Sequence, residues 1–253
     1  MPWRDGLTFA TQYSVRYNVA TPAATAMDHL LTAPEREALF LSLQVSTTAV
    51  LGALPMAFLA ALLLARGRFA GKTMLEGLLH LPLVLPPVAV GYLLLSALGT
   101  RTGLGAWLWQ VLGVRFVFSW TGAALASGLI TFPFQLRAIR QALEESDRGL
   151  IQAAETLGAG PLDRLLNVTL PLAWPGILSG AITAFAASLG EFGAIITFVS
   201  NIPGQTRTLP LAIYSALQSP GGDAEAARLS AISIGLALLF LALANLASRR
   251  SRP

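Results

Sequence analysis

Cysteine is absent from this chain of 253 residues, and charged side chains are scarce. Without cysteine, disulfide bonds and thiolate metal sites are excluded. Asp, Glu, Lys and Arg make up 12% of the residues, about half of the roughly 25% that is usual in soluble domains. A soluble protein of this length needs more charge to cover its surface. The 54% hydrophobic content also excludes a disordered chain.

Five long apolar stretches of the sequence contain no Asp, Glu, Lys or Arg. Each has the roughly 20 apolar residues that a helix needs to cross a bilayer. They predict an all-α, polytopic membrane bundle with about five transmembrane helices. The expected spans are about 38–65, 77–100, 116–137, 170–199 and 228–248, and Glu191 interrupts the fourth.

The start of the first span carries a helix signal. Thr32 and Glu35 have the spacing of a capping box, and Pro34 suits the first helical turn. Residues 1–33 are mixed and polar, without the apolar core of a signal peptide. We therefore expect an extracytoplasmic N-terminal tail at 1–33 and a transmembrane domain at 34–253.

Basic residues cluster beside the apolar stretches, as the positive-inside rule expects of cytoplasmic loops. The segment 66–72 has three cations and no acid, and Arg249, Arg250 and Arg252 follow the last span. This pattern places the C-terminus and the loop 138–169 in the cytoplasm and the N-terminus outside. Because these cations are distributed over the ends of several apolar stretches, they do not form one phosphate-binding face, and no nucleic acid partner is expected.

One segment has a partial likeness to an ATP site. Residues 70–73 resemble the end of a phosphate-binding P-loop, but that motif needs glycine where Arg66 stands. The motif also follows a buried strand, whereas a predicted membrane helix precedes this segment. The sequence thus shows no ATP site and no energy source of its own.

The loop 138–169 is the most informative cytoplasmic segment. Apolar residues recur at helical spacing, and glycines then end the helix before a second short helix, expected at Leu162–Val168. Such a hairpin is too small for a domain, and it is either a connecting loop or a docking element for a soluble partner. The apolar positions are Leu150, Ile151, Ala154 and Leu157.

Prolines and one acid interrupt the apolar stretches. Pro82, Pro86 and Pro87 remove backbone donors, which predicts a kink near a pathway or a structural bend. A similar break is expected at 131–135. Glu191 is costly inside a membrane, and either a pathway or gate role or a structural hydrogen-bonding role fits it. Gly190 and Gly193 beside it predict close helix approach.

The other polar residues do not indicate a metal site or a catalytic site on this chain. His80 is lone, because the second histidine, His29, lies in the tail, so no metal site is expected. Glu144, Glu145 and Asp147 form a solvated face or docking contacts. No catalytic triad can be assembled, and the chain is expected not to be an enzyme.

The loop resembles the EAA loop of ABC importer permeases. The matching positions are Gln152, Ala153, Ala154, Gly158, Val168, Leu170 and Pro171, with Gln152 and Val168 replacing the usual Glu and Ile. The resemblance implies the type I importer permease fold and an inner-membrane location. It also implies a coupling helix that seats in a separate cytoplasmic ATPase, which holds the ATP and magnesium. The implied coupling residues are Gln152, Ala153, Ala154, Leu157 and Gly158.

Three further segments resemble the molybdate permease group, at 81–92, 188–194 and 198–210. The resemblance implies a homodimer that imports molybdate or tungstate by alternating access, supplied by an extracytoplasmic oxyanion-binding protein. The candidate pathway or gate residues are Pro86, Pro87, Ser188, Glu191 and Gly193. Sulfate or thiosulfate is the alternative cargo. A stand-alone secondary transporter and a non-transporting scaffold are the competing functions.

Overall fold

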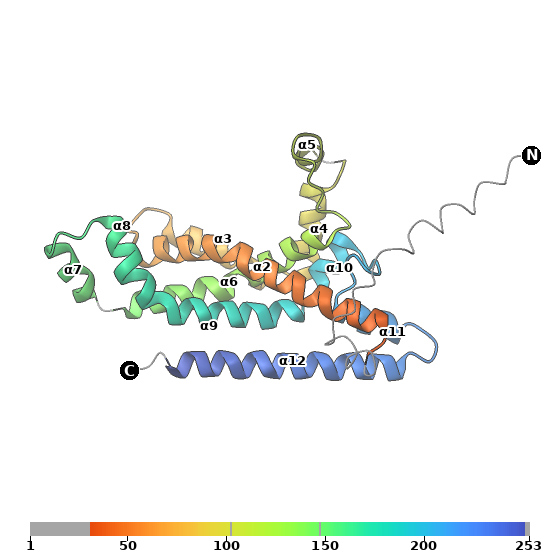
Figure 1. The fold of residues 1–253 in the computed structure, drawn as a ribbon. Helices are drawn as coiled ribbons and strands as arrows, with labels where there is room; N and C mark the ends of the chain where they lie inside the picture. Colours follow the sequence, from red (N-terminus) through yellow and green to blue (C-terminus); the bar gives the residue numbers. More distant parts are fainter. Residues whose placement is uncertain (1–30, 102, 147, 251–253) are drawn as a thin grey trace, which may run out of the picture.

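The computed structural model describes residues 31–101, 103–146 and 148–250, which form helices joined by loops (Figure 1). The expected tail at 1–33 lies almost wholly outside these residues. The elements are α2 (Ala33–Arg66), α3 (Lys72–Val84), α4 (Pro87–Leu98), α5 (Gly103–Leu112), α6 (Trp120–Glu145), α7 (Arg148–Thr156), α8 (Pro161–Arg164), the π-helix η1 (Leu165–Thr169), α9 (Leu170–Leu189), α10 (Gly193–Val199), α11 (Leu209–Leu217) and α12 (Asp223–Arg250).

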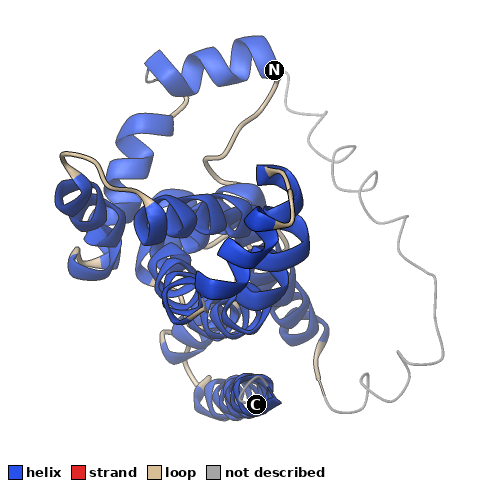
Figure 2. Ribbon diagram, turned by 90° about the vertical axis from the view of Figure 1, so that its left-hand side faces the viewer, coloured by secondary structure: helices blue, strands red, loops and turns tan. Residues whose placement is uncertain are grey.

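Three long helices, α2, α6 and α9, pack against one another as the centre of the bundle. Helix α12 lies along α9 at the edge, as the view from the α7 end shows (Figure 2). Helices α7 and α8 sit at one end of the bundle, while α4 and α5 project near the other (Figure 1). The two ends of the molecule therefore carry different elements, which sets where each candidate site lies.

The predicted capping box at the start of α2 is confirmed. The Thr32 amide donates to Glu35 Oε2 at 2.7 Å, and Pro34 lies in the first turn. The same carboxylate is only 1% exposed and accepts from Arg228 Nη2 at 2.9 Å. This ion pair, which the sequence did not predict, joins the starts of α2 and α12.

Two apolar clusters occupy the two halves of the central bundle. One contains Val45, Ala126 and Phe198, and the other contains Leu64 and Leu136. Along the helices, buried hydroxyl and amide side chains lie between the two clusters. They are Ser46, Ser127, Thr131, Gln135 and Ser188.

Small residues bring α9 onto α6. A Cβ atom added at Gly176 would lie 2.4 Å from the Ala142 Cβ, and one added at Gly180 would lie 3.0 Å from the Ala138 Cβ. Only glycine permits backbones to approach this closely, as small residues at a four-residue spacing do in membrane bundles. The spacing was visible in the sequence, but its partner surface was not.

The number of spans is not fixed by helix length and composition. Three of the described helical segments are long and apolar enough to cross a membrane: Ala33–Arg66, Pro161–Leu189 and Asp223–Leu243. The pair α3 and α4 would make a fourth if it counts as one span, although the two helices meet at 109°. Helix α6 is not among these segments.

Two local predictions are wrong. Residues 131–135 do not break the third span, because α6 runs unbroken through Pro133 from Trp120 to Glu145. Residues 162–168 do not form a separate short helix, because α8, η1 and α9 follow one another without an intervening loop. At Pro133, the packing of α6 against α2 and α9 keeps the segment helical where the local signal favoured a break.

Candidate functional site

The predicted docking hairpin is a projecting knob at one end of the bundle (Figure 1). Helix α7 packs chiefly against η1 and α8 and has few other contacts. Leucines of α7, of the turn that follows it, and of α8 and η1 are exposed, and the Leu157 side chain is 87% exposed. We call these exposed leucines the leucine knob: Leu150, Leu157, Leu162 and Leu166.

Gly158 makes the turn that ends α7, as the sequence predicted. Its φ is +85°, a conformation that residues with a side chain rarely adopt. The Gly158 amide donates to the Glu155 carbonyl at 3.0 Å, and the Ala159 amide donates to the Ala154 carbonyl at 3.0 Å. This pair of bonds is the Schellman motif, which satisfies the carbonyls left free at a helix end.

Ion pairs and hydrogen bonds hold the base of the knob. Arg164 Nη1 lies 2.8 Å from Glu155 Oε2, which joins α8 to α7. Arg66 Nη2 donates to the buried Thr169 Oγ1 at 2.8 Å, which joins the end of α2 to η1. The base is therefore joined internally and to the end of α2, while the leucines at the tip are exposed.

The other predicted coupling residues lie on α7. Gln152 and Ala153 are exposed and Ala154 is half-buried. Gln152 lines a cleft with Arg66, Arg68 and Lys72, the cations of the segment between α2 and α3. An amide can accept hydrogen bonds from such cations, so a carboxylate is not required at this position.

The predicted proline kink separates α3 from α4. Helix α3 ends at Val84, and α4 begins at Pro87 with Pro86 as its N-cap. The angle between the two helices is 109°. Pro82, by contrast, lies inside α3 without ending it.

Gly193 lies where α10 meets α4. A Cβ atom at Gly193 would lie 2.9 Å from the Pro87 Cβ, and one at Gly91 would lie 2.6 Å from the Ala194 carbonyl oxygen. The predicted close approach is thus confirmed at Gly193. It is wrong at Gly190, where the nearest atom is the Ala187 oxygen of its own turn, at 3.7 Å.

Glu191 stands in the break between α9 and α10. Its carboxylate Oε1 accepts from the Ala194 amide at 2.8 Å, and the residue is 8% exposed. A carboxylate in this position satisfies a free amide at the start of a helix. This hydrogen bond to the backbone matches the structural role that the sequence offered as one of two alternatives for Glu191.

Ser188 belongs to a buried group of three serines. Its Oγ lies 2.6 Å from Ser127 Oγ and donates to Ser46 Oγ at 2.9 Å. The three side chains come from α9, α6 and α2, and none is more than 3% exposed. Sequence reasoning missed Ser46 and Ser127. The available signal was a polar residue at every fourth position of α6: Ser127, Thr131 and Gln135.

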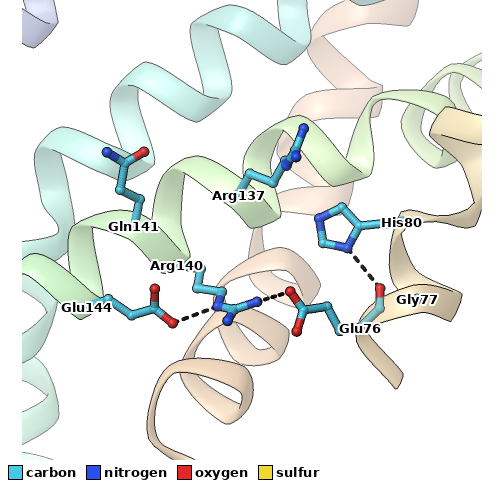
Figure 3. Close-up of a pocket in the computed structure, with 7 residues that line it drawn as sticks. All are labelled: Glu76, Gly77, His80, Arg137, Arg140, Gln141 and Glu144. Carbon is cyan, nitrogen blue, oxygen red and sulfur yellow. Dashed lines mark hydrogen bonds and ion pairs between the residues drawn. The ribbon is translucent and has the colours of Figure 1, made fainter. Parts of the chain in front are cut away.

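A charged cleft opens between α3 and α6 (Figure 3). Arg140 pairs there with Glu76 and with Glu144, whose Oε1 lies 2.7 Å from the Arg140 Nε. His80 Nδ1 lies 2.8 Å from the Glu76 carbonyl oxygen. Glu144 is thus part of an ion-pair network rather than only a solvated face, and Asp147 lies outside the described residues. Within the described part of the chain, no three His, Cys, Asp or Glu side chains group as a metal site would require.

Comparisons with known proteins agree with this architecture. Residues 53–252 match the binding-protein-dependent transport system inner membrane component family. The molybdenum transport system permease protein ModB of Escherichia coli (strain K12) is 54% identical over 223 residues, or 88% of this chain and 97% of that protein. ModB of Haemophilus influenzae (strain ATCC 51907 / DSM 11121 / KW20 / Rd) is 50% identical over 216 residues, or 85% of this chain and 94% of that protein.

A solved structure shares the fold. It is the crystal structure of a bacterial alginate ABC transporter in complex with an alginate pentasaccharide-bound periplasmic protein. The TM-score is 0.69 at 21% identity, over 92% of this chain and 83% of that chain. With the family match covering most of the sequence, the chain belongs to the binding-protein-dependent transport system inner membrane components.

Proposed function

We propose that this chain is the membrane-spanning permease subunit of an ATP-driven importer for molybdate or tungstate. The cargo is supported by two relatives, at 54% and 50% identity over most of the chain, that are named molybdenum transport permeases. Transport energy comes from a separate ATPase subunit, which binds ATP and magnesium. This chain supplies the path and the connection to that subunit.

The leucine knob is the observation that carries the coupling role. A membrane protein gains nothing from four exposed leucines at a water-facing end unless a partner covers them. The Leu157 side chain is 87% exposed at the tip of a turn that only glycine adopts readily. We assign the knob to a cleft of the ATPase, with Gln152, Ala153, Ala154, Leu157 and Gly158 as coupling residues.

The proposed topology has five spans: α2, the α3–α4 pair, α6, α9 with α10, and α12. Helix α6 packs against both α2 and α9. A helix shielded by neighbours needs less apolar surface than one facing lipid, so α6 can span despite its charged last turns. The positive-inside rule puts the α7 end in the cytoplasm and the start of α2 outside.

The proposed path lies at the interface between two copies of the chain. Five helices enclose too little volume for a gated path, and a two-fold interface completes one. Pro86, Pro87, Ser188, Glu191 and Gly193 are the candidate gate residues. They surround the junction of α4, α9 and α10, the place where helices are broken. An extracytoplasmic binding protein delivers the oxyanion to the outer end.

Reconstitution tests this function. The chain, its ATPase and the binding protein are placed in liposomes, and uptake of molybdate, tungstate and sulfate is measured with and without ATP. We expect ATP-dependent uptake of molybdate or tungstate, with sulfate at least about tenfold weaker. Equal uptake of sulfate would contradict the assignment of molybdate or tungstate as the cargo. Uptake driven by an ion gradient without the ATPase would contradict the proposed importer and indicate a secondary transporter.

A further inference from the structure

The charged cleft between α3 and α6 has features that coupling and gating do not use. Its volume is about 440 Å³, ample for a hydrated tetrahedral anion. Figure 3 shows side chains from the two facing helices that line it. The lining residues are Glu76, Gly77, His80, Arg137, Arg140, Gln141 and Glu144.

The two arginines of the cleft differ in how they are paired. Arg140 is held by two carboxylates, those of Glu76 and Glu144. Arg137, one turn earlier on α6, is exposed and has no hydrogen-bond or ion-pair partner among the residues that the structure describes. The cleft therefore holds one neutralised guanidinium and one whose five donors are available.

His80 faces this space from α3. Its Nδ1 lies 2.8 Å from a carbonyl oxygen, which can only accept, so Nδ1 carries the proton. The other ring nitrogen has no recorded partner within the described residues, and Figure 3 shows the ring on the Arg137 side of the cleft. In its protonated form this nitrogen is a second donor, aimed at the same space from the opposite helix.

We propose that this cleft binds a tetrahedral oxyanion, with Arg137 as the principal ligand and His80 opposite. A guanidinium binds phosphate-like oxygens through two parallel hydrogen bonds, and an unpaired one in an open cleft is the strongest anion ligand that a protein offers. The Glu76–Arg140 ion pair links α3 to α6 beside this space, and Glu144 pairs with Arg140 from the same helix.

The cleft lies at the knob end of the bundle, which is cytoplasmic under the proposed function. Two sources there carry the required chemistry. One is a free oxyanion in the cytoplasm, whether the transported ion or inorganic phosphate. The other is the phosphate headgroup of an anionic lipid, since Arg137 stands near the end of a membrane helix.

Anion binding to the full chain in lipid nanodiscs tests the site. In discs of phosphatidylcholine alone, we expect molybdate, sulfate or inorganic phosphate to bind, as measured by calorimetry. Arg137→Gln should weaken that binding about tenfold. Arg137→Lys should weaken it less, because lysine keeps the charge but cannot form two parallel hydrogen bonds to the anion. His80→Gln should weaken it by a smaller factor. Arg101→Gln removes one charge at the far end of the bundle and should leave affinity within about twofold.

A second set of discs contains phosphatidylglycerol. Arg137-dependent retention of this lipid through purification, with free-anion binding suppressed, would assign the same site to a headgroup. Free-anion binding that persists in these discs would assign it to a soluble oxyanion. The inference is overturned if Arg137→Gln matches the parent chain in both sets of discs. A failed molybdate uptake assay with Arg137-dependent binding intact would remove the proposed cargo and leave this site standing.

Discussion

The two ends of the segment from α8 through α9 are held in opposite ways. At the knob end, leucines are exposed and the elements have few contacts. At the other end, the Ser188 hydroxyl and the Glu191 carboxylate are buried and hydrogen-bonded. Buried polar groups fix one packing arrangement, because each loses free energy if its partner moves. The exposed leucines have no such partner and are available for another protein.

The largest loss of stability is expected from overpacking between α6 and α9. Gly176→Leu places side-chain atoms where the Ala142 Cβ already lies 2.4 Å from an added Cβ. We expect the free energy of unfolding in detergent to fall by about 3 kcal/mol. Gly235→Leu, on α12 with open space around the added atom, is the matched control. Equal stability of the two variants would contradict the close packing.

The second-largest loss of stability is expected from a change in the buried group of three serines. Ser188→Ala leaves Ser127 and Ser46 without their shared partner, and we expect a loss of about 2 kcal/mol in the free energy of unfolding. Thr183→Val, on the same helix but exposed, should change it by less than about 0.5 kcal/mol. If the two variants unfold alike, the serines do not form the network described.

A substitution in the knob should instead reduce function much more than stability. Gly158→Val forces a β-branched residue to φ of +85°, at a cost of about 1–2 kcal/mol within the turn. We expect ATPase co-purification and ATP-driven uptake to fall about tenfold, while the unfolding temperature of the bundle falls by only a few degrees.

Gly160→Val provides the control for this turn. Gly160 has φ of −67° and open space around an added Cβ, so valine fits without strain. Normal uptake by this variant and loss in Gly158→Val would locate the effect in the turn. Normal uptake and normal ATPase binding in both would refute the coupling assignment.

The smallest change in stability is expected from Glu191→Gln. The amide oxygen can still accept from the Ala194 amide, so the free energy of unfolding should stay within about 0.5 kcal/mol of the parent. Glu191→Ala removes the acceptor and should cost about 1 kcal/mol. Because Gln removes only the charge, reduced uptake at full stability would support a gate role, and full uptake would leave capping as its role.

Features specified by neighbouring residues could be predicted from the sequence. The Thr32–Glu35 capping box, the end of α3 before Pro86 and the turn at Gly158 each depend on a few adjacent positions. Local sterics and hydrogen bonding decide them, so a single sequence suffices. The proposed coupling residues, by contrast, came from the resemblance of this loop to the EAA loop of ABC importer permeases.

Features that depend on distant residues could not be predicted. Ser188 and Ser46 are 142 positions apart, and Glu35 and Arg228 are 193 apart. Pro133 leaves α6 unbroken because packing overrides its local cost. Nothing in the sequence alone states which helices become neighbours, so these contacts are products of the tertiary fold.

The absence of a loop between α8 and α9 has a mechanical consequence. From Leu162 to Ser188 the backbone is helical throughout, over a length of about 40 Å. The π-helix η1 and Pro175 interrupt the regular α-helical pattern within this stretch, and these are the usual places for a helix to bend. Leu162 and Leu166 are therefore linked to Ser188 through one continuous helical backbone, and a change in its bend at η1 or Pro175 would alter how these exposed leucines stand relative to the buried serines.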